Sequence, residues 1–379
     1  MIELIQNNNL SLRLNSGVSL INTLNQNATK PKLNISYSDN LIKENTPDNL
    51  LFQKIIENKQ LFNKTISSNK DISKVNIFFT NSEQGNWYTL KDSIYFMSWY
   101  LRINNIFLST DQTKSFKNES QYSFFWRSTF LLLPNLVKFN ILINENAQQD
   151  KYIDNFEFTL RQRLMEVLIS RDLLYLQTFN RNWFLLPYEF DNILLRITGM
   201  LDSLAWFINK FYHLDLKKWE CSYNRREFKN KLNCKEYQVL YKIFNHYSNE
   251  INIIHILRNK IHSSRNNSFM SYKGSTADVE IVIFIDQATM LEITNAVNKK
   301  NTRGFFLKIG IEKNTLNNNE HKFIPCKFID YIFSGFITFI NNTLEEIDYY
   351  SDLKHPTKSN NEFDYYSDIS RDFFRSVLI

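Results

Sequence analysis

Residues 253–264 read Ile-Ile-His-Ile-Leu-Arg-Asn-Lys-Ile-His-Ser-Ser, with polar side chains that recur at helical spacing. At about 100° per residue, an α-helix collects positions i, i+3, i+4 and i+7 on one stripe. Four polar residues form that stripe: His255, Arg258, Asn259 and His262. Ile254, Leu257 and Ile261 fall on the opposite side. The segment therefore predicts an amphipathic helix whose apolar side faces a core.

The polar stripe has the groups from which a phosphate site can be built. A guanidinium offers planar, bidentate recognition of a phosphate and stabilises the charge on a phosphorane. An imidazole can give and take protons near neutral pH. The same spacing is also typical of a solvated polar face whose cations interact favourably with the helix dipole. Spacing alone leaves both interpretations open.

The segments around this stripe predict a mainly helical protein. Helical periodicity extends over several long stretches of the chain, namely 90–108, 122–143 with a break at Pro134, 152–179, 187–214, 235–247 and 324–347. Gly199 lies inside one of them, which costs helix stability unless something packs closely against it. Arg161, Arg163 and Arg171 are predicted to form a solvated helix face.

Smaller elements are predicted in the remaining parts of the chain. Residues 10–14 and 33–37 are predicted to be strands or ordered loop, and a helix over 49–62 follows the capping signal of Thr46 and Pro47. A strand–helix–strand insert is predicted after the polar stripe, with its elements at 279–285, 287–297 and 305–311.

These patterns suggest four regions. A mixed α/β region is expected over residues 1–85 and an aromatic-rich helical region over 86–182. A helical domain with a strand-containing insert at 277–312 is expected over 183–350, followed by an acidic tail over 351–379.

The composition excludes several classes of site. Only 7 Gly and 6 Pro occur among 379 residues, which argues against glycine-rich phosphate loops and large β-architectures. The chain has no GxGxxG after a strand, no GxxxxGK[ST], no HExxH and no CxxC, so neither a metal nor a cofactor is expected. The net charge of +6 is compatible with a nucleic-acid partner. Three unpatterned cysteines and the lack of a signal or membrane segment predict a cytoplasmic protein.

The stretch Leu257-Arg-Asn-Lys-Ile-His262 resembles the signature of the HEPN superfamily, the helical domains of many bacterial RNase toxins and defence proteins. That signature has an Arg, commonly followed by a polar residue such as Asn, and then a His. Leu201-Asp-Ser-Leu-Ala-Trp206 resembles the superfamily's first core helix, which also has an acidic residue in mid-helix. The resemblance covers residues 187–350 and implies a HEPN-like antiparallel helical bundle. The chain departs from the pattern because only three residues separate Arg258 from His262, where the usual motif has at least four.

The resemblance implies a metal-independent endoribonuclease, acting as a toxin or anti-phage effector. His262 would serve as general base or acid, Arg258 would stabilise the phosphorane, and Asn259 would hold the phosphate or orient His262. His255 would be a second imidazole. Asp202 would pair with Arg258, or else face solvent. Two copies would place their motif helices face to face as a homodimer, with RNA as substrate and an antitoxin or sensor as a further partner.

Two other classes remain open. The shortened motif favours a catalytically inactive HEPN-like protein that binds RNA or nucleotide, or scaffolds a partner of a defence system. A purely structural helical protein would leave the polar stripe in open solvent.

A basic stretch lies between the two predicted core helices. Lys217, Lys218, Arg225 and Arg226 would contact an RNA backbone, with Trp219 and Tyr223 interleaved for base stacking. A solvated linker is the alternative, and it would account for the same run of charges.

Overall fold

The computed structural model describes residues 2–6, 33–57, 61–66, 73–79, 85–110, 121–136, 151–180, 182–263, 268–272, 279–297, 302–313, 320–347 and 378. The chain divides into two compact units, one of Met1–Leu132 with Ser359–Ile379 and the other of Leu133–Lys358. The four regions suggested by the sequence have other boundaries, after residues 85, 182 and 350. The predicted strand at 10–14 and almost all of the acidic tail lie outside the described residues.

The first unit combines two small sheets with helices. Its four-stranded sheet has the order β3-β2-β4-β5, with β2 parallel to β3 and antiparallel to β4. A separate antiparallel pair joins β1 to β6. The elements are β1 (Ile2–Gln6), β2 (Leu33–Tyr37), η1 (Asp39–Ile42), α2 (Pro47–Ile56), β3 (Phe62–Ile66), β4 (Lys74–Phe79), β5 (Asn86–Thr89), α3 (Leu90–Ile103), β6 (Ile106–Thr110) and α4 (Gln121–Leu132). The strand predicted at 33–37 is confirmed.

Two predicted helix ends in this unit are wrong. Thr46 caps α2 as expected, since its hydroxyl accepts from the Asn49 amide at 3.3 Å, but α2 ends at Ile56 and Phe62 opens β3. Likewise, α3 ends at Ile103 and the next apolar residues form β6. Asn105 has φ 59°, a left-handed conformation that turns the chain out of the helix.

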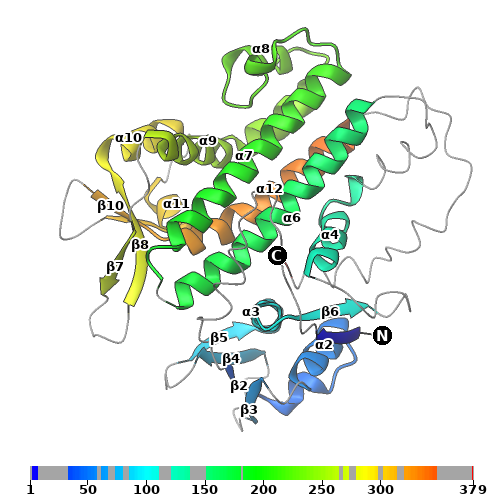
Figure 1. Cartoon of the computed structure of the whole chain (residues 1–379), viewed down its shortest axis with the longest axis vertical. Helices are drawn as coiled ribbons and strands as arrows, with labels where there is room; N and C mark the ends of the chain where they lie inside the picture. The colour runs from blue at the N-terminus through cyan, green and yellow to red at the C-terminus, as the bar shows by residue number, and fades with distance from the viewer. Residues whose placement is uncertain are drawn as a thin grey trace, which may run out of the picture. The chain divides into compact units, whose positions relative to one another are not determined.

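The second unit is built on four long helices, which confirms the mainly helical prediction. They are α6 (Lys151–Phe179), α7 (Leu186–Phe211), α9 (Gln238–Ser263) and α12 (Pro325–Glu346). The first two run antiparallel and pack along each other, while α9 packs against both α7 and α12 (Figure 1). Their shared core is rich in Leu, Ile and Phe side chains that are fully buried.

The polar-stripe helix is longer than the sequence predicted. Separate helices were expected over 235–247 and 250–264, but α9 continues through this point. The Ser248 hydroxyl donates to the Asn245 carbonyl at 2.9 Å within the helix, so its polar group is satisfied without a break. Two short helices, η3 (Lys218–Glu220) and α8 (Arg226–Leu232), lie between α7 and α9 in the sequence.

The insert is an antiparallel sheet with two helices. The sheet has the order β7-β8-β10-β9. Its elements are β7 (Ser268–Tyr272), β8 (Val279–Asp286), α10 (Gln287–Ala296), α11 (Thr302–Lys308), β9 (Ile311–Lys313) and β10 (Glu320–Phe323). The predicted β8 and α10 are confirmed.

The strand predicted over 305–311 is wrong, because most of that segment is the helix α11. Phe305 is buried and packs edge-on against Tyr331 of α12, with ring centroids 5.8 Å apart. Gly310 has φ 77° and ends the helical segment before β9 begins. A short apolar run fits a strand or a buried helix equally well, so its periodicity did not decide the case.

The arginines of α6 do not form a solvated face. Arg161 is 7% exposed and its guanidinium donates to Glu157 at 3.2 Å. Arg171 is 2% exposed and lies over the ring of Phe333, 4.5 Å from the centroid. The sequence prediction is therefore wrong for both. Arg163 is half-buried and contacts α7.

Among the described helices, none combines the length and the apolar character needed to cross a bilayer.

Candidate functional site

The polar stripe of α9 borders a cleft of about 670 Å³ in the second unit. Residues of α6, α7, α9 and the segment that contains η3 line the cleft. Three of the predicted stripe residues line it: His255, Arg258 and Asn259. The predicted Asp202, Lys218 and Arg225 line the same cleft from other elements. Residues spread over 58 positions of sequence, from 202 to 259, thus meet at one place.

The helix that carries the stripe is oriented by its apolar side. Ile254 and Leu257 are 1% and 4% exposed, which confirms that this side faces the core. Ile261 is only partly buried. The backbone of His262 belongs to α9, but its side chain lies outside the described part of the chain. The role predicted for the His262 imidazole therefore stays a prediction.

Among the three stripe side chains that the structure describes, His255 is the most buried. Its side chain is 6% exposed, and its Nε2 has no hydrogen-bond partner among the described residues. Burial lowers the pKa of His255 to about 4; the Asp202 charge opposes this shift, and the charges of Arg258 and Lys229 add to it. The imidazole is therefore neutral at pH 7, with one ring nitrogen able to accept a proton or a hydrogen bond.

This burial predicts a specific loss of stability in acid. Because the folded pKa of His255 lies near 4 and its ordinary value is 6.5, the unfolded chain binds more protons between these pH values. His255 then contributes stability that is complete above pH 6.5 and is lost as the pH falls towards 4. We expect a His255→Gln variant to show a shallower decline of the unfolding free energy, by up to about 1.4 kcal/mol per pH unit.

Urea unfolding followed at several pH values between 7 and 4 measures this difference. His246→Gln is the matched control, because His246 is exposed on the same helix. If the His255→Gln variant and the wild type lose stability in parallel, His255 does not occupy the buried, neutral state.

Of the two alternatives for Asp202, a pair with Arg258 or a solvent-facing position, the structure has the second. In the described residues no ion pair joins Asp202 to Arg258, and Asp202 is exposed and accepts from the Ser222 hydroxyl at 2.9 Å. The Arg258 Nη1 donates to the Asn259 amide oxygen at 3.2 Å, whereas its Nε is buried without a hydrogen-bond partner in the described structure. The guanidinium is thus positioned by a neutral neighbour and retains donor capacity toward the cleft.

The segment after α7 is held in a defined conformation by Asn209. Its side chain donates to the Leu216 carbonyl at 3.1 Å and accepts from the Leu216 amide at 3.0 Å. His213 and Asp215, which lie between Asn209 and Leu216 in the sequence, adopt left-handed φ values of 49° and 57°. The segment that leads into the basic stretch therefore has a defined conformation, although Lys217, Lys218, Arg225 and Arg226 are themselves exposed.

The basic stretch contributes only part of its charge to the cleft. Lys218 and Arg225 line it, but Lys217 and Arg226, although both are described, do not. Trp219 also lines the cleft and is 62% exposed. Tyr223 is 1% exposed and packs against Phe228, Phe244 and Phe339. The prediction that Tyr223 stacks on bases is therefore wrong, because its ring belongs to the core.

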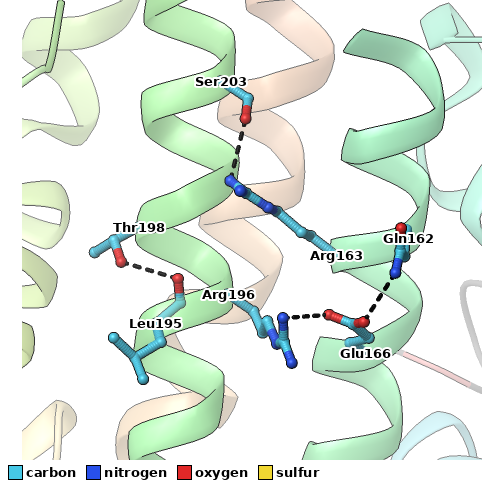
Figure 2. A network of polar contacts seen from close by, with 7 residues as sticks. All are labelled: Gln162, Arg163, Glu166, Leu195, Arg196, Thr198 and Ser203. Carbon is cyan, nitrogen blue, oxygen red and sulfur yellow. Dashed lines mark hydrogen bonds and ion pairs between the residues drawn. The ribbon is translucent and has the colours of Figure 1, made fainter. Parts of the chain in front are cut away.

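Sequence reasoning missed one cation of the cleft. Arg163 of α6 lines it, and its Nη1 donates to the Ser203 hydroxyl on α7 at 3.1 Å (Figure 2). The available signal was Gly199, a glycine in mid-helix that implied a close neighbour. What the sequence did not reveal is that this neighbour is a guanidinium.

Comparison of the chain with protein-family models gives no match, and comparisons with curated proteins and with solved structures give none either. The resemblance to the HEPN superfamily therefore depends on the quoted motif residues.

Proposed function

We propose that the chain binds RNA in this cleft and cleaves it as an endoribonuclease of the HEPN type. The observation that carries the proposal is the convergence in one cleft of His255, Arg258 and Asn259 with Asp202 of α7. A solvated polar stripe would not account for the His255 Nε2 or the Arg258 Nε, two buried atoms that have no hydrogen-bond partner among the described residues. Both groups are what a bound phosphodiester would satisfy.

The proposed reaction uses the RNA's own 2′-hydroxyl as nucleophile. A bond forms between the 2′-oxygen and the neighbouring phosphorus, and the bond from phosphorus to the 5′-oxygen breaks. The products are a 2′,3′-cyclic phosphate and a 5′-hydroxyl. His255, neutral at pH 7, accepts the proton of the 2′-hydroxyl, and Arg258 stabilises the charge on the phosphorane. To His262 we assign protonation of the departing 5′-oxygen, in accordance with the motif.

Asp202 has a supporting role in this scheme. Its charge raises the pKa of His255, against the effect of burial, so it stabilises the imidazolium that forms when the proton is accepted. Lys218 and Arg225 supply positive charge for the flanking phosphates, and the exposed ring of Trp219 offers a stacking surface for an unpaired base.

The test is a cleavage assay on purified protein with end-labelled single-stranded RNA in the presence of EDTA. We expect cleavage, products that carry 2′,3′-cyclic phosphate ends, and no cleavage of DNA of the same sequence because it has no 2′-hydroxyl. His255→Ala and His262→Ala should each lower the rate by about 10²–10⁴-fold. Intact RNA after prolonged incubation with the folded wild type would refute the nuclease. Full activity in either variant would refute that residue's role.

Binding without cleavage is the second candidate function. It is favoured by the low pKa of His255, near 4, which makes this imidazole a weak general base, and by the short spacing of the motif. RNA that binds the wild type but survives intact in the same assay would identify this case.

The biological role that we propose is that of a toxin or anti-phage effector that acts as a homodimer. Expression of wild type and His262→Ala in a bacterium, with growth and total RNA followed, tests the first part. Light scattering of the purified chain tests the second.

A further inference from the structure

Gly199 lies in mid-helix on α7, where a glycine costs about 1 kcal/mol relative to alanine. A Cβ built at this position would lie 2.3 Å from the Nη1 of Arg163 and 2.7 Å from its Cζ. Real side chains do not approach so closely. The glycine thus leaves the space in which the Arg163 guanidinium rests against α7 and reaches Ser203.

The acidic neighbour that would ordinarily neutralise Arg163 is engaged elsewhere. Glu166 lies three residues further along α6, at the spacing of a helical ion pair. Its carboxylate instead pairs with Arg196 of α7 at 2.9 Å and accepts from the Gln162 amide at 3.3 Å (Figure 2). In the described residues no carboxylate lies within ion-pair distance of Arg163, whose contact with Ser203 is a neutral one.

Arg163 therefore brings a positive charge to the cleft that the protein itself does not neutralise by direct pairing. Burial lowers the pKa of this guanidinium and the charge of Arg196 lowers it further, against the opposing effect of Asp202 and Glu166. A guanidinium nevertheless remains protonated in proteins. An anion bound in the cleft would offset the desolvation free energy of this half-buried charge.

We propose that Arg163 is a further phosphate-binding guanidinium of this cleft, which acts beside Arg258 of the same chain, and that Gly199 is the positioning residue that lets it reach the phosphodiester. The inference rests on the proposed function and deepens it. The family resemblance had implied that a second copy's motif helix supplies the second guanidinium. Here α6 and α9 of one chain each provide a guanidinium group, Arg163 and Arg258, to the same cleft. The ligand class is a single-stranded RNA phosphodiester, whose one negative charge is shared by its two non-bridging oxygens.

The test is a binding titration by fluorescence anisotropy. The probe is a labelled single-stranded RNA with 2′-O-methyl riboses, which binds through its phosphates but cannot be cleaved. We expect Arg163→Gln and Gly199→Ala each to weaken binding about tenfold. The slope of log K against log salt should fall by about 0.7 for Arg163→Gln, because one phosphate contact is lost. The double variant should bind no more weakly than Arg163→Gln alone.

Two matched controls exist in the same unit. Lys242→Gln removes a positive charge from the exposed side of α9. Gly335→Ala adds a Cβ to α12 at an ordinary 3.7 Å from Tyr247. Both should bind the probe as the wild type does, with an unchanged salt slope.

The outcomes separate this inference from the proposed function. If Arg258→Gln weakens binding but Arg163→Gln and Gly199→Ala do not, Arg163 has no role at the phosphate although the cleft still binds RNA. If Gly199→Ala weakens binding further in the Arg163→Gln background, the positioning role of Gly199 is wrong. Failure of the wild type to bind the probe overturns both proposals. Circular dichroism shows whether each variant is folded. If Gly199→Ala does not fold, the binding of Arg163→Gln tests the role of Arg163.

Discussion

An Arg258→Ala variant is expected to cleave RNA about 10²–10³-fold more slowly than the wild type, because the phosphorane would lose its guanidinium. Arg258 lines the cleft, and within the part of the chain that the structure describes its buried Nε has no hydrogen-bond partner, so this donor would be available to a bound phosphate. The effect should fall mainly on kcat, since charge on the non-bridging oxygens is greatest in the transition state. Initial rates on end-labelled RNA over a range of substrate concentrations provide the measurement.

Lys242→Ala is the control for this change, because it removes the same charge from the same helix at an exposed position. It should leave both kcat and KM unchanged. An Arg258→Ala variant that retains wild-type kcat would show that the polar stripe does not carry the chemistry, even if the chain proves to be a nuclease.

Arg161→Ala is expected to cost about 3 kcal/mol of unfolding free energy, the largest effect that we foresee for a single charge outside the cleft. The side chains of Arg161 and Glu157 are 8% and 9% exposed and lie 3.2 Å apart. The substitution would leave the Glu157 carboxylate buried without this guanidinium, a costly state for a charge. The shift of the urea unfolding midpoint and the slope of the transition give the measurement.

A double variant separates the two causes of this loss. Arg161→Met combined with Glu157→Leu removes both charges and keeps the volume, so it should recover most of the stability. Lys308→Ala, at an exposed position of α11, should change the free energy by less than about 0.5 kcal/mol. A similarly small change for Arg161→Ala would mean that the residue is solvated, as its sequence context suggested.

The part of the site that could be predicted is the part that depends on local periodicity. The 3.6-residue repeat placed His255, Arg258 and Asn259 on one stripe of α9, and all three line the cleft. The same repeat put Ile254 and Leu257 in the core, where both are buried. It also indicated α6, α7 and α12 to within a few residues.

The errors arise where a residue's partner lies far away in sequence. Tyr223 appeared to be part of a solvent-exposed basic stretch, yet its ring is buried against Phe244 and Phe339. Phe305 appeared to begin a strand, but its contact with Tyr331 belongs to a helix packed on α12. Phe244, Phe339 and Tyr331 are all too far away in the sequence to influence the local pattern around Tyr223 or Phe305.

The sequence by itself determined that α9 is amphipathic and that its polar side offers imidazole, guanidinium and amide groups. It also placed a glycine in mid-helix at 199, which costs helix stability unless something packs closely against it. Only the tertiary structure decided that this neighbour is Arg163, that Arg196 pairs with Glu166, and that Asp202 lines the same cleft as Arg163. The physical reason is that periodicity reports which way a side chain points along its own helix. Burial, charge pairing and pKa depend on the elements that pack against that helix.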